Sequence, residues 1–401
     1  MKTKNIYYSI FILLLFSCKN EYKQGVEYID LLKEYSFSDT IISPNPSKKT
    51  LIFDREFELS LIGEYNKVLF YWDKGAQKNK RKLPVAAATY FKKFKAINAQ
   101  YYITKQATKE QIVIINEAHH NPRHRVFTKS LLNGLYKAGY RYFGVEALSE
   151  KTSINKRHFP LINDGFYVKE PQFGDLLREA KKEGFTLFEY ESQINFDTTK
   201  GKTREIEQAR NIKKVLDKDP NAKIVIHCGF DHVYECDSLG NWEKAMAGRL
   251  KEFTGINPLT LDQVEFTEHS SSEYNNLLFN TIDIDYSAIF VDSTGKVFNG
   301  FPNHDCYDIR VYHPLTKLMY GRPNWLFECN RIPYFVNQKI SVSFPCLVFA
   351  YRPRESIFAV PYDIIELKSR TDKKALALKN ENYKIIVIDF KGKKQEFNIR
   401  L

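Results

Sequence analysis

Cysteine is scarce in this chain, and no two cysteines form a CxxC pair. The six cysteines are spread over 401 residues. This spacing excludes a dense disulfide framework and argues against a thiolate zinc site. Most of the cysteines after Cys18 are therefore expected to be small buried hydrophobic residues. A disulfide between Cys228 and Cys236, which flank a histidine-containing loop, remains open.

Long hydrophobic runs are also missing beyond the first eighteen residues, so no transmembrane helix is predicted there. The opening, MKTKNIYYSIFILLLFSC, has the lysines, short apolar run and small residue that are typical of a signal peptide. Its last residues, LFSC, resemble a bacterial lipobox. This resemblance implies lipidation of Cys18 and a lipoprotein anchored in the bacterial cell envelope, on the outer membrane, facing the periplasm or the cell surface. An unmodified secreted protein is the alternative.

A concentrated basic stripe is absent too, although the formal net charge is +12. The lysines are scattered, and the densest run, KNKRK at 78–82, is short. Nucleic acid is therefore not an expected partner. Attraction to the anionic headgroups of an envelope membrane is the simpler interpretation of the positive charge.

Sequence patterns divide the chain into four parts. Residues 1–17 are the predicted signal peptide, and residues 18–83 are a polar tether and N-terminal segment. Residues 84–269 alternate apolar strands with helices, which predicts an α/β domain with a mostly parallel sheet covered by helices on both faces. Residues 270–401 alternate aromatic and β-branched residues between turn signals, which predicts a β-rich, sandwich-like domain.

Five strands are expected in the α/β domain, with a helix over residues 84–108 leading into the first. Ligands bind outside the carboxyl ends of the strands in such sheets. The connection between Ala147 and Thr186 is longer than one crossover needs, so an extra loop is expected near that edge. The expected strands are IVIIN at 112–116, YRYFGVEA at 140–147, TLFEYES at 186–192, KIVIHCG at 223–229 and LTLDQVEF at 259–266.

Acidic and imidazole side chains gather where four of these strands end. Glu117 and His119 follow the first strand, Glu146 ends the second, and His232 follows the fourth. Such a set can hold a divalent metal (zinc, manganese or cobalt), with Glu117, His119 and His232 as ligands. It can also work without a metal, with histidine as the general base for an attacking water. We expect all four residues to be catalytic.

Four further residues are expected to contact the substrate. Glu189 and Glu191 alternate with aromatic residues at the end of the third expected strand, and either can be a supporting partner of the site. Arg204 can clamp an anionic group of the substrate or pair with a neighbouring glutamate. The set is Arg204, His124, Glu189 and Glu191.

Two more histidines have simpler interpretations. Glu117 and His119 are two residues apart and should point the same way, whereas His120 should point to the opposite side. His227 lies inside an apolar strand and is expected to be a core histidine. The helix that opens at Asn121 carries partial positive charge at its start.

The strand-end motifs resemble those of the superfamily that joins ChaN-like haem-uptake lipoproteins, Tiki-type metalloproteases and erythromycin esterases. The resemblance covers about residues 111–266. Asn116 stands where the family has glycine, and His120 where the ChaN-like motif has aspartate. The matching segments are NEAHHNPRH, with Glu117, His119, Asn121 and His124 in place, YFGVEAL with Glu146, REIEQARNI with Arg204, and HCGFDH with His232.

The resemblance implies more than one activity, because a shared fold hosts different chemistries. Hydrolysis of an ester or amide in a small molecule or peptide is the leading expectation. The alternative is a lipoprotein that binds haem or iron without turnover, with His119, His120 or His124 as the axial ligand.

Two motifs lie in the C-terminal part. NHDCYD, at 303–308, gathers groups that can bind a metal, but no second cluster completes a ligand set. GRPNWLF, at 321–327, presents Arg322 and Trp325, which can grip a sugar or a peptide. A tryptophan beside proline is more often an anchor of the core.

Overall fold

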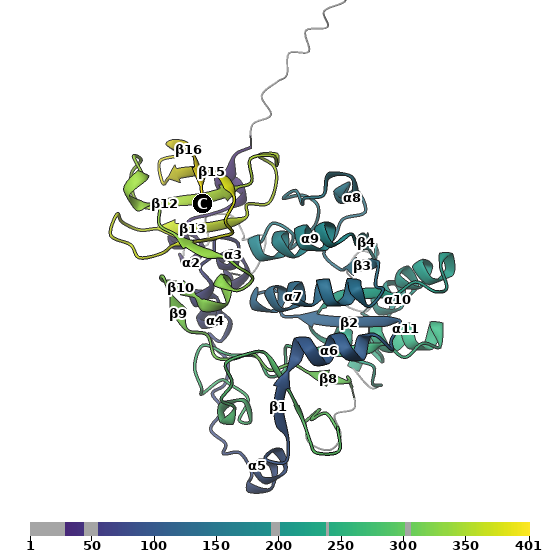
Figure 1. Ribbon diagram of the computed structural model, residues 1–401. Helices are drawn as coiled ribbons and strands as arrows, with labels where there is room; N and C mark the ends of the chain where they lie inside the picture. Colours follow the sequence, from purple (N-terminus) through teal and green to yellow (C-terminus); the bar gives the residue numbers. More distant parts are fainter. Residues whose placement is uncertain (1–28, 44–54, 194–200, 238–239, 301–305) are drawn as a thin grey trace, which may run out of the picture.

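The computed structural model describes five stretches of the chain: residues 29–43, 55–193, 201–237, 240–300 and 306–401 (Figure 1). The predicted signal peptide and Cys18 lie outside these residues, as do His304 and Asp305 of the NHDCYD motif. No helix within the described stretches is both long and apolar enough to cross a membrane.

A parallel sheet of six strands forms the α/β part of the molecule, in the order β4-β3-β5-β2-β6-β8. The predicted sheet is thus confirmed, and all five expected strands are present. The sixth strand comes from the C-terminal part of the chain. The strands are β2 (Ile112–Glu117), β3 (Tyr142–Val145), β4 (Thr186–Glu189), β5 (Ile224–Gly229), β6 (Leu259–Asp262) and β8 (Ile309–Arg310).

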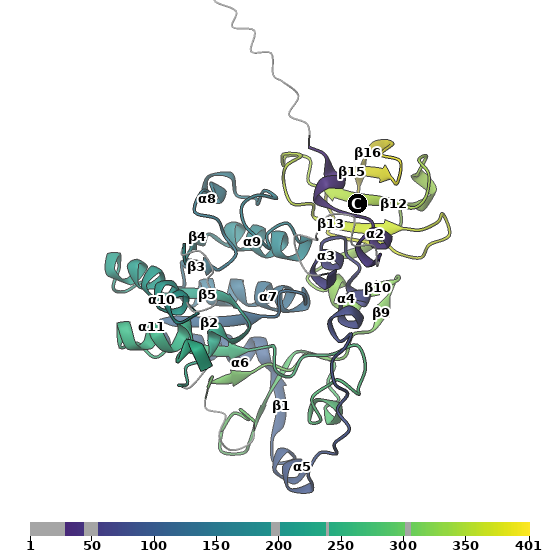
Figure 2. The same cartoon turned by 180° about the vertical axis from the view of Figure 1, so that it is seen from behind.

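Helices cover both faces of this sheet (Figures 1 and 2). Val113 and Ile115 belong to one buried cluster, whereas Ile112 and Ile114 belong to another. This two-sided burial explains the unbroken apolar sequence of the strand. The first cluster includes residues of α6 (Ala99–Ala107), α7 (Arg123–Lys137) and α9 (Pro171–Glu183), and the second those of α10 (Gly201–Lys218) and α11 (Met246–Thr254).

The prediction of one helix over residues 84–108 is wrong. The segment forms α5 (Val85–Phe91), the strand β1 (Lys95–Asn98) and then α6. β1 pairs antiparallel with β7 (Ala288–Val291), a partner far away in the sequence that local periodicity does not reveal. The pairings β1–β7 and β6–β8 both run across the predicted boundary at residue 270.

The long connection after Ala147 contains more than one crossover helix. It includes the short helix α8 (Ile154–Arg157) and a bridge between Leu148 and Gly165 before α9 begins. Tyr167 in this loop stacks on His119, so the loop lies beside the carboxyl end of β2.

The C-terminal part is built from antiparallel strands, as predicted. Its main sheet has the order β13-β12-β15-β16 and packs one face against the N-terminal helices and α9. The opposite face packs against β11 and β14. The elements are α1 (Leu31–Glu34), α2 (Ser38–Ile42), α3 (Arg55–Leu61), α4 (Tyr65–Trp72), β9 (Leu318–Met319), β10 (Arg322–Pro323), β11 (Ile332–Tyr334), β12 (Cys346–Tyr351), β13 (Asp363–Leu367), β14 (Leu376–Leu378), β15 (Asn382–Asp389) and β16 (Lys394–Arg400).

One disulfide links Cys236 to Cys306, whose Cα atoms are 4.6 Å apart. Pairing of Cys236 with Cys228, which the sequence left open, is therefore wrong. Cys228 is free and buried in β5, where its Sγ lies 3.6 Å from the carbonyl oxygen of Ile115. Cys346 is buried as expected, whereas Cys329 is exposed.

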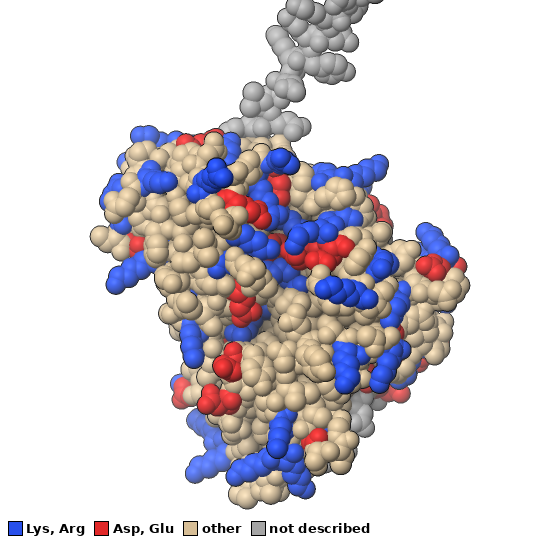
Figure 3. Space-filling view, viewed as in Figure 1, with Lys and Arg blue, Asp and Glu red and all other residues tan. Residues whose placement is uncertain are grey.

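Charge is mixed on the face of the molecule that Figure 3 shows. Lysine and arginine side chains are spread over this face and alternate with aspartate and glutamate. The positive charge does not form a single stripe on it.

Candidate functional site

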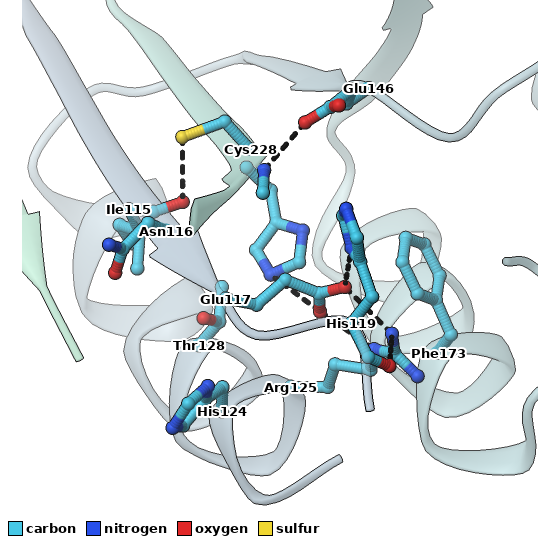
Figure 4. A network of polar contacts seen from close by, with 12 residues as sticks. Ile115, Asn116, Glu117, His119, His124, Arg125, Thr128, Glu146, Phe173 and Cys228 are labelled. Atoms are coloured by element: carbon cyan, nitrogen blue, oxygen red, sulfur yellow. Dashed lines mark hydrogen bonds and ion pairs between the residues drawn. The ribbon is translucent and has the colours of Figure 1, made fainter. Parts of the chain in front are cut away.

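The carboxyl ends of neighbouring strands bring the predicted residues to one edge of the sheet. Glu117 ends β2, Glu146 follows β3, and Glu191 follows β4. His232 lies in the short 3-10 helix η1 (Phe230–Val233), directly after β5. Figure 4 shows Glu117, His119 and Glu146 around this edge.

Glu117 forms a buried ion pair with Arg125, a residue that the sequence analysis did not single out. Arg125 donates from Nε to Oε2 and from Nη2 to Oε1, both at 2.7 Å. Burial raises the pKa of Glu117, but the charges of Arg125 and His227 outweigh it and hold the pKa well below its usual range. Glu117 is therefore a permanent carboxylate.

His119 is oriented by this carboxylate. Its Nδ1 lies 3.0 Å from Oε1 of Glu117. Because an ionised carboxylate can only accept a hydrogen bond, Nδ1 carries the proton, and Nε2 of the neutral ring keeps its lone pair. The ring stacks on Tyr167, with 4.0 Å between centroids, and the side chain is 20% exposed.

Gly229, the last residue of β5, makes room for this ring. A Cβ atom at Gly229 would lie 2.5 Å from Nε2 of His119 and 3.4 Å from Oε2 of Glu146. Its backbone N–H donates to the same Oε2 at 2.5 Å. Nε2 of His119 and the carboxylate of Glu146 therefore approach each other across Gly229.

Arg204, on α10, connects the remaining strand ends. It donates from Nη2 to Glu146 at 2.6 Å and from Nη1 to Nε2 of His232 at 2.7 Å. Glu191 accepts from its Nε at 3.0 Å and from its Nη2 at 2.5 Å. Burial raises the pKa of Glu146, but the charges of His232 and Arg204 lower it to about 2.

His232 is held from both of its ring nitrogens. Nδ1 lies 2.8 Å from Oε2 of the fully buried Glu205, and Nε2 accepts from Arg204, which places the proton on Nδ1. The ring stacks on Trp242. Burial lowers the pKa of His232, whereas Glu146 and Glu205 raise it above its usual value.

Asn116 ties the end of β2 to two neighbouring loops. Its buried amide donates to the carbonyl of Phe230 at 2.9 Å and to Asp262 at 2.7 Å. It also accepts from the backbone N–H of Gln263 at 2.8 Å. These bonds join β2 to the loops after β5 and β6, which a glycine could not do.

Two predicted substrate contacts do not join the cluster. His124 is fully buried, with Nδ1 accepting from the N–H of Ala118 at 3.0 Å and Nε2 3.2 Å from the hydroxyl of Thr267. Burial lowers its pKa to about 3, so it is a neutral residue that holds the turn. Glu189 is exposed at the end of β4, whereas Glu191 faces Arg204.

The side chains of His120 and His227 are buried. His120 stacks on Trp72 at 3.7 Å, and burial holds its pKa well below the usual value. His227 is buried with Nε2 3.5 Å from Glu117, and burial lowers its pKa to about 4. Both ring nitrogens of His124 have partners, so this residue has no nitrogen left for a haem iron.

The expected metal ligands do not fit a divalent ion in this arrangement. Both oxygens of Glu117 already accept from Arg125. The guanidinium of Arg204 already bonds Nε2 of His232, the third expected ligand, together with Glu146 and Glu191. Across the described stretches, no group of three or more His, Cys, Asp or Glu side chains is arranged to hold a metal ion.

The C-terminal motifs are structural where they are described. Arg322 is buried and pairs with Asp363 at 2.5 Å, and Trp325 is buried against Tyr65. Trp325 is thus a core anchor. Asp308 of the NHDCYD motif accepts from the backbone N–H of Thr260 at 3.0 Å.

Sequence reasoning did not assign Arg125 and Glu205 to the cluster. The position of Arg125 was a usable signal, because it occupies the first helical turn after a strand that ends in a carboxylate. Tyr167 lies in the extra loop that was expected near this edge, but its stacking on His119 depends on tertiary packing.

Comparisons with known proteins leave the family open. No family model matches the chain, and no curated protein is significantly similar to it. Among solved structures, the type III effector HopBA1 matches with a TM-score of 0.35 and 12% identity, over 55% of this chain and 96% of that chain. RRSP, a MARTX toxin effector domain from Vibrio vulnificus CMCP6, matches with a TM-score of 0.30 and 11% identity, over 64% of this chain and 49% of that chain.

Proposed function

We propose that this protein hydrolyses an ester or amide bond by acid–base catalysis, with His119 as the general base. The observation that carries the proposal is the contact of 3.0 Å between Nδ1 of His119 and Oε1 of Glu117. This contact leaves the lone pair of Nε2 beside Gly229 and Glu146 on a partly exposed ring, where it can accept a proton from water.

Glu117 acts on the reaction through His119. When Nε2 takes a proton from the attacking water, the ring becomes an imidazolium, and the adjacent carboxylate stabilises its charge. The imidazolium returns this proton to the leaving alcohol or amine as the C–O or C–N bond breaks, which restores the neutral ring and releases the acid. Arg125 keeps that carboxylate ionised and fixes its direction. Glu117 and Arg125 are thus positioning residues, whereas His119 exchanges the proton.

Arg204 and Glu146 form the second half of the proposed site. Glu146 lies beside Nε2 of His119 across Gly229 and is bonded to Arg204. A fixed guanidinium near the reacting carbonyl favours the negative charge that develops on its oxygen. Glu191 and Glu205 hold this half in place.

The proposed chemistry needs no metal at this cluster, since Arg204 supplies the positive charge. Anchoring through a lipidated Cys18 in the bacterial envelope stays a prediction from the sequence.

The test measures hydrolysis of p-nitrophenyl esters and of peptide p-nitroanilides by the full chain. His119→Gln should lower kcat by about 10²–10⁴-fold, the usual contribution of a positioned general base. The matched control is His158→Asn, which removes an exposed histidine with φ of 69° and replaces it with a residue that tolerates this conformation. Equal activity of His119→Gln and the wild type would contradict the proposal.

A further inference from the structure

A second group of polar residues lies on the opposite side of the loop that carries His119. Arg123, the first residue of α7, lines a pocket between this loop, α4 and the segment around Trp325. Tyr65, Val68 and Leu69 of α4 form one wall of the pocket. His120, His313 and the carboxylate-bearing Glu268 also line it, so its surface combines apolar and polar groups.

Arg123 is unusual among the buried arginines of the described chain, because it has no carboxylate within ion-pair distance. It is only 5% exposed, and its Nη1 has no hydrogen-bond partner. The other buried arginines are all paired: Arg125 with Glu117, Arg178 with Glu355, Arg310 with Glu265, Arg322 with Asp363 and Arg331 with Asp175.

An unpaired buried guanidinium is costly, because it gives up its hydration without gaining a counter-charge. Burial lowers the pKa of Arg123, and Glu268 and Glu328 offset this effect only in part. Neither carboxylate forms an ion pair with Arg123 within the described residues. The Oε2 atom of Glu268 instead accepts from the backbone N–H of Thr316 at 2.9 Å.

Other features around Arg123 also favour a negative charge. Arg123 opens a helix of 15 residues, whose dipole places partial positive charge at this end. Pro122, at the N-cap, supplies no capping acceptor, whereas Oδ1 of Asn121 accepts from the N–H of Arg123 at 3.3 Å. Nδ1 of the buried His120 has no partner either, so a neutral imidazole is left with an unused polar atom in the pocket lining.

We propose that this pocket binds a compact oxyanion, a carboxylate or phosphate group of a small molecule, through Arg123. The pocket has a volume of about 40 Å³, and the half-buried Leu69 would lie against the rest of the ligand. The site is separate from the proposed catalytic base, because His119 and His120 point to opposite sides of the loop and stack on Tyr167 and Trp72, respectively.

The experiment measures binding of sodium phosphate and of sodium benzoate to the full chain by calorimetry and by the shift in Tm. Sodium chloride at equal ionic strength is the reference for screening. At least one anion should bind the wild type saturably and raise its Tm. Arg123→Met should weaken that binding roughly ten- to a hundredfold, the loss expected for a charge-assisted hydrogen bond.

Two variants keep the result interpretable. Arg210→Met, which removes an exposed arginine on α10, should bind the anion as the wild type does. Arg123→Lys keeps the charge and should retain weakened binding. Without anion, Arg123→Met should be at least as stable as the wild type, because it removes an uncompensated buried charge.

The outcomes separate the alternatives. Binding of phosphate alone or of benzoate alone supports the site and identifies the group that it accepts. The proposal is overturned if neither anion binds, or if Arg123→Met binds as the wild type does. It is also overturned if Arg123→Met lowers Tm without anion as much as Glu268→Gln or Glu328→Gln does, since Arg123 would then be a structural ion-pair partner. None of these readouts depends on the hydrolysis proposed for His119.

Discussion

Glu117 and Arg125 form a bidentate pair in which both side chains are buried, with two N–O distances of 2.7 Å. Arg125 also donates to Glu170 at 3.0 Å and to the carbonyl oxygen of His119 at 2.8 Å. One arginine thus joins the end of β2, the start of α7 and the start of α9. The pair fixes the position of His119 as well as the ionisation of Glu117.

Removing the charge of Glu117 should destabilise the protein. In Glu117→Gln, the buried Arg125 keeps only Glu170 as a counter-charge, and breaking a buried pair costs roughly 3–5 kcal/mol. Urea unfolding at pH 7 measures this loss. Glu189→Gln, which removes an exposed carboxylate, is the matched control and should change stability by less than about 0.5 kcal/mol.

The same variant has a predicted pH dependence. The pKa of Glu117 is lower in the folded protein than in the unfolded chain. Its contribution to stability is therefore complete above the unfolded value of about 4.3 and is lost as the pH falls below it. The stability difference between wild type and Glu117→Gln should shrink below about pH 4. A difference that stays constant down to pH 3 would mean that Glu117 is not held ionised by Arg125.

Gly229→Ala tests the position of the His119 ring. The added Cβ would lie 2.4 Å from Cε1 and 2.5 Å from Nε2 of His119, so the ring must move. The backbone of Gly229 has φ of −86°, which alanine adopts without strain. We expect kcat to fall about 10²-fold with folding retained, as for a catalytic group displaced by about 1 Å. An unchanged kcat would show that His119 takes no part in the reaction.

Metal removal should leave the activity unchanged. Arg204 already bonds Glu146, Glu191 and Nε2 of His232, so zinc, manganese and cobalt have no vacant position there. Elemental analysis of the purified chain should find no stoichiometric metal that is lost in His232→Ala. Inactivation by a chelator, reversed by one of these ions, would contradict the proposed role of Arg204.

The disulfide predicts a specific cross-linked peptide. Digestion under non-reducing conditions should join the peptides of Cys236 and Cys306 and leave Cys228 free. Cys306→Ser should lower stability by about 2–4 kcal/mol, since the bridge closes a loop of 70 residues. Cys228→Ser places a hydroxyl in the same buried site as the thiol and should leave the cross-link intact. A peptide that joins Cys228 to Cys236 would overturn the assignment.

The sequence by itself determined the parallel sheet and the edge at which Glu117, His119, Glu146 and His232 meet. Apolar strands that alternate with helices can bury both of their faces in few ways, and parallel strands end at the same edge. Periodicity also predicted correctly that His119 and His120 would diverge. It did not predict that only Glu191 contacts Arg204, because residues two apart share a face of a strand and β4 ends at Glu189.

Only the tertiary structure decided which partners these residues have. Arg204 bonds three strand ends, and a disulfide joins Cys236 to Cys306; both connect segments that are remote in the sequence. The burial of His124 and the lack of an ion-pair partner for Arg123 likewise depend on what packs around them. A hydrophobic period specifies the face on which a side chain lies, whereas an ion pair or a disulfide depends on distances of a few ångströms between remote segments. Those distances are set by the packing of the whole chain.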